Sequence, residues 1–99
     1  MLDELKNYLD ITWDDEKTNE KIAGILERAK KVLSSYAGVD LDFSDLSDRQ
    51  LLFDCCRYIR SNAYEDFKDN YSAELIMLRA KYAVSAAQNE GDGDENAEN

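Results

Sequence analysis

The sequence predicts an all-α protein, a small bundle of three main helices preceded by a short N-terminal helix. The 99 residues include no proline, so nothing in the chain forbids the hydrogen bonds of a helix interior. Apolar residues recur three or four positions apart along most of the chain, which is the spacing of one helix face. No sustained run alternates β-branched with polar residues, so we expect no strands.

The first two predicted helices are separated by a short break. Residues 2–9 place three leucines on one side of a short helix, and residues 10–13 interrupt it. Asp14 is the expected N-cap of a long helix over about 15–36, and Gly38 is a natural left-handed stop after it. This helix has the clearest apolar stripe in the chain, formed by Ile22, Ile25, Leu26, Ala29, Val32, Leu33 and Tyr36.

The third predicted helix covers about 48–67 and follows a loop, residues 38–47, that is rich in turn and cap formers. Ser44 or Ser47 is the expected N-cap, and Gln50 is spaced to complete a capping box with Ser47. Apolar residues recur every four positions, at Leu51, Cys55, Ile59, Ala63 and Phe67, with Leu52 and Cys56 beside them.

The fourth predicted helix, about 71–88, is apolar on two sides. One face carries Tyr71, Leu75, Leu78 and Tyr82, and the other carries Ile76, Met77, Ala80, Ala83 and Val84. A helix that is apolar on more than one side is usually buried on more than one side. Either this helix lies at the centre of the core, or its second face contacts a partner.

These patterns yield two sets of candidate residues. The candidate core consists of Leu5, Leu9, Ile22, Ile25, Leu26, Ala29, Leu33, Leu52, Cys55, Ile59, Leu75, Leu78 and Tyr82. The candidate interface with other subunits or partners consists of Tyr58, Arg60, Tyr64, Ile76, Met77, Arg79, Ala80 and Ala83. Tyrosine and arginine are enriched at protein interfaces, although here they also suit the rim of a core or a solvated face.

The charge is strongly acidic and unevenly distributed. The chain has 22 acidic and 12 basic residues, a net charge of −10, which disfavours binding to nucleic acid phosphates or to anionic membranes. Residues 89–99 carry five acids, no base and no large apolar side chain. We therefore expect one helical domain over residues 1–88 and a disordered acidic tail over 89–99. The tail is either solubilising or orders on a basic partner.

The sequence offers little material for catalysis or metal binding. It has no histidine, and the adjacent Cys55 and Cys56 cannot clasp a metal without further ligands. We expect both to be core thiols in a reducing compartment. Residues 40–45 only superficially echo a calcium loop, because the glycine and bidentate glutamate positions are Asp45 and Leu51. We expect no catalytic residue, metal or cofactor, and therefore no enzyme. No apolar run is long enough to span a bilayer, and the acidic, amphipathic start is not a signal peptide.

The order of these segments resembles the head–tail connector proteins of tailed phages, also called head-completion adaptors. The resemblance begins with a short L-K-x-Y-L-like helix, an acidic break and a long helix that ends near Y-x-G, here Leu5, Lys6, Tyr8, Leu9, Asp14, Asp15, Ile22, Ile25, Leu26, Ala29, Tyr36 and Gly38. The segment LLFDCCRYIRSNAYEDF is similar to the family's third helix. The start of its last helix is similar to Glu74, Leu75, Leu78, Arg79, Tyr82 and Ala83. The resemblance covers about residues 1–86.

The resemblance implies a structural virion protein. Subunits of this family form a ring, typically of twelve copies, that docks below the portal protein, extends the DNA channel and receives a stopper or tail protein. DNA would pass through without specific binding. The expected location is the head–tail interface of the virion, with assembly in the host cytoplasm.

Two other functions remain open from the sequence. One is an acidic DNA mimic that inhibits a nucleic-acid enzyme of the host, although half of the net charge lies in residues 89–99 rather than on a folded face. The other is a small helical regulator that binds a host protein.

Overall fold

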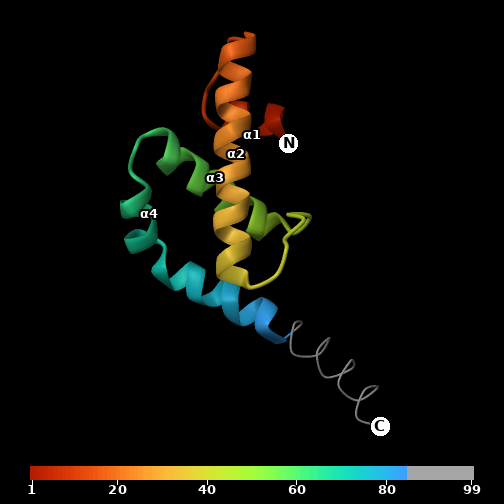
Figure 1. Ribbon diagram of the computed structural model, residues 1–99, viewed down its shortest axis with the longest axis vertical. Coiled ribbons are helices and arrows are strands. Elements are labelled where there is room, and N and C mark those ends of the chain that lie inside the picture. Colours follow the sequence, from red (N-terminus) through yellow and green to blue (C-terminus); the bar gives the residue numbers. More distant parts are fainter. Residues whose placement is uncertain (85–99) are drawn as a thin grey trace.

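The computed structural model describes residues 1–84, and these residues form helices and no strand. The all-α prediction is therefore confirmed for this part of the chain. The elements are α1 (Leu2–Tyr8), α2 (Glu16–Ala37), α3 (Leu46–Arg60), α4 (Tyr64–Asn70) and a helix over residues 72–84 (Figure 1). The predicted tail at 89–99 and the end of the predicted 71–88 helix lie outside the described residues. Among residues 1–84, no helix is both long enough and apolar enough to cross a membrane.

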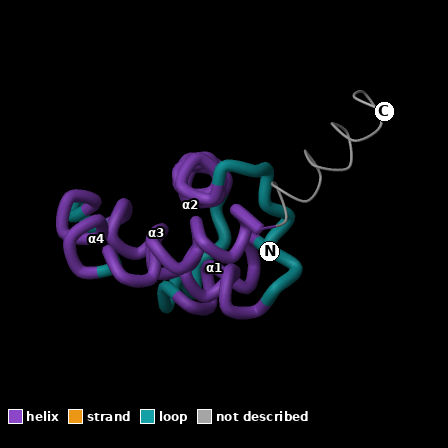
Figure 2. The backbone as a smooth tube through the Cα atoms, turned by 90° about the horizontal axis from the view of Figure 1, so that it is seen from below, coloured by secondary structure: helices purple, strands orange, loops and turns teal. Residues whose placement is uncertain are grey.

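Among residues 1–84, α2 is the longest helix and forms one side of the fold. In a view along the α2 axis, the other helices lie together on one side of α2 (Figure 2). Of these helices, α3 packs most extensively against α2. The predicted stripe is the buried side of α2, with Ile22, Leu26, Ala29 and Leu33 at 5% exposure or less. Burial of such a stripe removes apolar surface from water, which is the main driving force for packing the helix.

The two ends of α2 follow local rules, with one correction. Asp15, not Asp14, is the N-cap, because its carboxylate accepts a hydrogen bond of 2.8 Å from the Thr18 amide. Asp14 instead accepts from the Asn19 side chain at 2.7 Å. Gly38 ends the helix at a φ of 78°, the left-handed conformation that glycine adopts without a steric cost.

The start of α3 also differs from the prediction. Asp45 is the N-cap, and its carboxylate accepts hydrogen bonds from the Ser47 amide at 2.8 Å and the Asp48 amide at 3.2 Å. Neither predicted serine has this role. The Gln50 side chain donates to Asp54 at 3.0 Å, which it meets one turn later on the helix surface, so the expected capping box is absent.

The predicted third helix, 48–67, is two helices in the structure. Helix α3 ends at Arg60, and α4 begins at Tyr64. Asn62 between them has a φ of 57°, a left-handed conformation that asparagine tolerates better than most residues. The Ala63 amide then donates to the Tyr58 carbonyl oxygen at 2.8 Å, which satisfies a carbonyl at the end of α3.

This turn brings α4 back against α3 and builds an aromatic cluster, defined here as Tyr58, Tyr64, Phe67 and Tyr71. Phe67 is fully buried, and its ring centroid lies 4.7 Å from that of Tyr71 and 5.6 Å from that of Tyr58. Tyr64 stacks on the other side of Phe67 at 6.4 Å. Such pairs add stability beyond the area they bury. Tyr71 of this cluster directly precedes the 72–84 helix.

Most of the candidate core is buried. Leu5, Leu9, Leu52, Cys55, Ile59, Leu75 and Leu78 are at 8% exposure or less, together with the α2 residues above. Ile25 and Tyr82 are only partly buried and pack against the rim of this core. The core also contains residues outside the candidate set, namely Ile11, Ala37, Phe43, Leu51, Phe53, Cys56 and Phe67.

Candidate interaction surface

The 72–84 helix passes beneath the C-terminal end of α2 (Figure 1). One of its faces is buried against the core. Leu75 and Leu78 on that face are 4% and 3% exposed, and Tyr82 is partly buried one turn later. These positions lie three or four residues apart, so they form a single line along the helix. The face predicted to enter the core therefore does so.

A polar contact fixes the same face against the start of α3. The Lys81 ammonium lies 3.0 Å from carboxylate oxygens of both Asp45 and Asp48, and the Tyr82 hydroxyl donates to Asp48. Asp48 is a buried carboxylate, 4% exposed, so these donors replace the water it loses on folding. We call Asp45, Asp48, Lys81 and Tyr82 the polar latch.

The polar latch shifts the pKa values of Lys81, Asp45 and Tyr82. The hydrogen bond with Asp45 raises the pKa of Lys81 above its usual range. Hydrogen bonds from the Ser47 hydroxyl and then from Lys81 hold the pKa of Asp45 well below its usual range. The hydrogen bond to Asp48 raises the pKa of Tyr82. Lys81 is therefore positively charged and Asp45 negatively charged across the neutral pH range, and the two attract each other.

The opposite face of the 72–84 helix is apolar and exposed to solvent. Ile76 is 69% exposed, Met77 is 70% exposed and Val84 is 60% exposed. Ala80 and Ala83 are also exposed and lie at helical spacing between them. We call these five residues the apolar stripe. Contiguous patches of large exposed apolar side chains are uncommon on monomeric proteins, and they often mark interaction sites.

A groove runs along each edge of the apolar stripe. On one edge, Met77 and Leu78 face Leu51 and Asp48 of α3 across a cavity of about 260 Å³. The exposed Leu46, 77% accessible, begins α3 beside this groove. On the other edge, a second groove of about 290 Å³ is lined by residues that include Tyr36, Lys68, Ile76 and Arg79. Predicted interface residues Ile76, Met77, Arg79, Ala80 and Ala83 therefore share one region, at the stripe and its edge.

The remaining predicted interface residues lie elsewhere. Tyr58 and Tyr64 are half-buried members of the aromatic cluster, and Arg57 and Arg28 respectively lie over their rings. Arg60 is exposed at the end of α3. The break after α3 separates Tyr64 from the helix on which it was expected, so these three residues do not form the continuous patch that one long helix would give.

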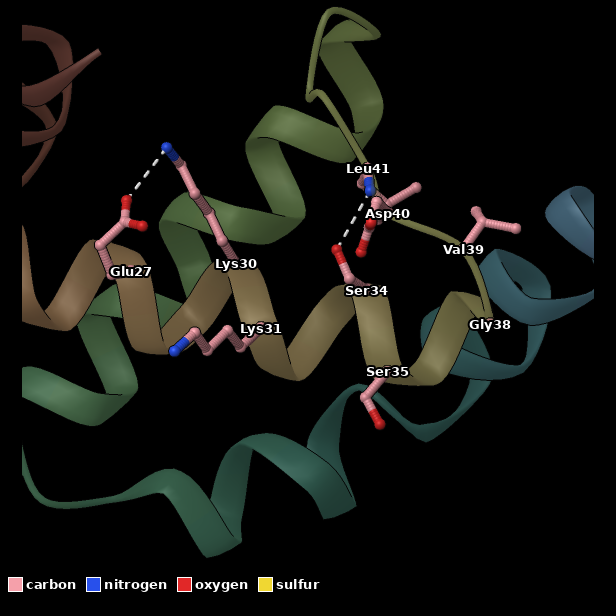
Figure 3. A pocket seen from close by; sticks show the side chains of 9 residues that line it. All are labelled: Glu27, Lys30, Lys31, Ser34, Ser35, Gly38, Val39, Asp40 and Leu41. Atoms are coloured by element: carbon pink, nitrogen blue, oxygen red, sulfur yellow. Dashed lines mark hydrogen bonds and ion pairs between the residues drawn. The ribbon is translucent and has the colours of Figure 1, made fainter.

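Another hollow lies between the end of α2 and the loop that follows it (Figure 3). Its side chains engage one another, since Ser34 accepts a hydrogen bond of 3.1 Å from the Leu41 amide and Lys30 pairs with Glu27 at 3.3 Å. The hollow is open, has a volume of about 660 Å³ and is also lined by Lys31 and Asp40. The arrangement anchors the loop to α2.

Residues 1–84 contain no group of three potential metal-ligating side chains. Cys55 and Cys56 are fully buried, and burial raises the pKa of each thiol to about 12. A protonated, inaccessible thiol is a poor nucleophile, so the pair contributes to packing.

The sequence missed the residues that hold the stripe in place. Asp45 and Asp48 are separated from Lys81 by more than thirty positions, and no local pattern links them. The exposed apolar position of Leu46 was not predicted either, because residues 38–47 were expected to be a loop. The only signal was the two-sided apolar pattern of 71–88, which marked the helix but not its anchor.

No protein-family model, curated protein or solved structure matches this chain.

Proposed function

We propose that this protein is a structural subunit of a phage head–tail connector, which assembles as a ring below the portal and extends the DNA channel toward the tail. The apolar stripe carries this proposal. Leu75, Leu78 and the polar latch anchor the 72–84 helix to the core. The same helix exposes Ile76, Met77 and Val84 to solvent, and this apolar surface is removed from water only when a partner binds it.

The anchoring matters because assembly requires a rigid contact surface. A ring is built from heterologous contacts, in which one patch of each subunit meets a different patch of the next. The apolar stripe supplies one such patch, on a helix whose orientation is fixed by the core rather than by the partner. Binding then orders few additional side chains and loses less conformational entropy.

The charge supports a passive contact with DNA. Residues 1–84 carry 17 acids and 12 bases, a net charge of −5, and the whole chain reaches −10. A wall of this sign repels phosphates, so DNA in transit is not retained. The proposed partners are the portal protein, a stopper or tail protein and other copies of this chain, and the proposed role is structural rather than catalytic.

The test is the mass and shape of the assembled protein. Size-exclusion chromatography with light scattering, from micromolar to millimolar chain and with the portal protein of the same phage, is followed by negative-stain imaging of large species. We expect a closed ring, alone or on the portal, near twelve times the chain mass of 11.3 kDa. A monomer at every concentration that also fails to co-elute with the portal would contradict the proposal.

A further inference from the structure

A second surface carries charge rather than apolar area. The groove of about 290 Å³ beside the apolar stripe adjoins another of about 450 Å³, and the two share Tyr36 and Lys68. Lys31 lines one groove and Arg79 lines the other, while Arg28 lies 5.3 Å from the ring centre of Tyr64 at the margin. We call this continuous surface, with its four cations Arg28, Lys31, Lys68 and Arg79, the basic groove.

The positive charge of the basic groove is largely uncompensated within residues 1–84. No carboxylate lines either of its two parts. Glu65 pairs with Lys68 at 3.0 Å from the rim, and within the described chain Lys31 and Arg79 form no ion pair. Both of these cations are exposed. The basic groove is thus a local positive site on a domain whose net charge is negative.

We propose that the basic groove binds the acidic segment 89–99 of its own chain. This segment carries Glu90, Asp92, Asp94, Glu95 and Glu98 and no base, so its charge complements the four cations of the groove. The net charge of −5 on residues 1–84 opposes contact with the domain as a whole, whereas the cations of the basic groove attract the segment locally. The inference does not depend on ring assembly.

The chain is long enough for this contact. Ser72 lies in the groove, and the helix that follows it advances about 1.5 Å per residue, so residue 84 is about 18 Å farther along the axis. The fifteen residues 85–99 span about 50 Å when extended, at about 3.3 Å per residue. That length covers the return path. A tethered segment also has an effective concentration in the millimolar range, which favours its own groove over that of another chain.

The contact depends on salt and contains aromatic surface. Exposed charge pairs weaken when the Debye length falls from about 30 Å at 0.01 M salt to about 3 Å at 1 M. The half-buried Tyr36 and Tyr64 line the basic groove, and Arg28 and Lys68 make cation–π contacts with the ring of Tyr64.

Paramagnetic relaxation in the full-length chain tests the proposal. A nitroxide is attached at Ala97→Cys, and the unsubstituted chain confirms that the two buried thiols take no label. At about 0.01 M salt we expect the amide signals of Ser35, Tyr64 and Lys68 to lose most of their intensity, and at about 1 M salt to recover it. Broadening that is absent at low salt, or unchanged by salt, overturns the proposal.

Two charge variants locate the contact. Lys31→Gln with Arg79→Gln removes two cations of the basic groove and abolishes the broadening. Lys17→Gln with Lys21→Gln removes two exposed cations from the opposite end of α2 and leaves it unchanged. Equal effects of the two variants would show attraction by overall charge only and would contradict a defined site.

Two further outcomes overturn the proposal in favour of another occupant. If comparable broadening appears in an isotope-enriched chain without a nitroxide when labelled chain without isotope enrichment is added, the segment binds another copy. If a DNA duplex binds with an affinity that Lys31→Gln lowers, while the nitroxide broadens nothing, the groove is a phosphate site.

Discussion

Asp48 joins two helices that are distant in the sequence. It lies in the first turn of α3, is 4% exposed, and accepts hydrogen bonds from Lys81 and Tyr82 of the 72–84 helix. Removing one partner of a buried, hydrogen-bonded charge costs more free energy than the bond itself contributes, because the remaining buried group is left without a hydrogen bond. This residue therefore determines how firmly the apolar stripe is held.

Replacing Asp48 by asparagine tests the latch. Because the substitution removes the charge with little change in volume, we expect a loss of about 2 kcal/mol in the free energy of unfolding. Hydrogen exchange at the Leu78 amide should accelerate, since the 72–84 helix opens more often. Urea denaturation and exchange measured by NMR provide the readouts. Asp69→Asn, at an exposed carboxylate, is the control and should change stability by no more than about 0.5 kcal/mol.

The two cysteines show the opposite case, in which burial suppresses chemistry. Both are fully buried, and burial raises the pKa of each thiol to about 12. At pH 8 we expect slow reaction with Ellman's reagent in the native protein and rapid reaction of both thiols in guanidinium. Ser35→Cys, at an exposed position of α2, should react at once. Rapid modification of the unsubstituted native chain would show that α3 opens readily.

At the scale of elements, two aspartates define where helices begin. The Thr18 amide lowers the pKa of Asp15, and the Ser47 hydroxyl is the largest cause of the lowered pKa of Asp45. A carboxyl whose folded pKa lies below its unfolded value of 3.8 stabilises the fold above that value. This contribution disappears as the pH falls toward the folded pKa.

Acid denaturation should therefore depend on these caps. We expect the urea midpoint to be level from neutral pH to about pH 5 and to fall steeply below about pH 4. The double substitution Asp15→Ser and Asp45→Ser retains a capping oxygen but removes the titrating group, so the fall with acid should be shallower. An equally steep fall in this variant would show that other carboxylates control acid stability.

The elements differ in how far the sequence predicts them. Helix α2 follows from its stripe and from Gly38, because both signals are local. The break between α3 and α4 is hidden, because Ala63 and Phe67 continue the four-residue spacing across it and no glycine or proline marks the turn. Only Asn62, in its left-handed conformation, signals the turn, and asparagine occurs in many other settings.

Loop residues of the core were equally difficult to predict. Phe43 has a φ of 59° and is 2% exposed, so its backbone takes an unfavourable conformation that burial of the ring offsets. Nothing in residues 38–47 indicates which side chain turns inward. The candidate site was predicted in part, since the two-sided pattern of the fourth helix identified Ile76 and Met77, whereas the latch required the tertiary structure.

At the scale of the whole molecule, the surface divides by chemistry. The apolar stripe lies between two grooves, of which one is lined by Asp48 in the first turn of α3 and the other belongs to the basic groove. The rest of the described surface is on balance negative. Apolar contact supplies affinity while charge determines orientation and rejects wrong partners. This division is compatible with the proposed subunit, in which the apolar stripe is one of two contact patches and the negative surface does not retain DNA.

The most direct test of the central claim is sedimentation velocity of the unsubstituted chain and of the Ile76→Gln, Met77→Gln variant over the same concentration range. Both side chains are about 70% exposed, so the variant should stay folded by circular dichroism. We predict that the unsubstituted chain associates as concentration rises, while this variant remains a monomer and the Lys17→Gln, Lys21→Gln control associates normally. Identical sedimentation of all three proteins at every concentration, both alone and with the portal protein added, would contradict assembly through the apolar stripe.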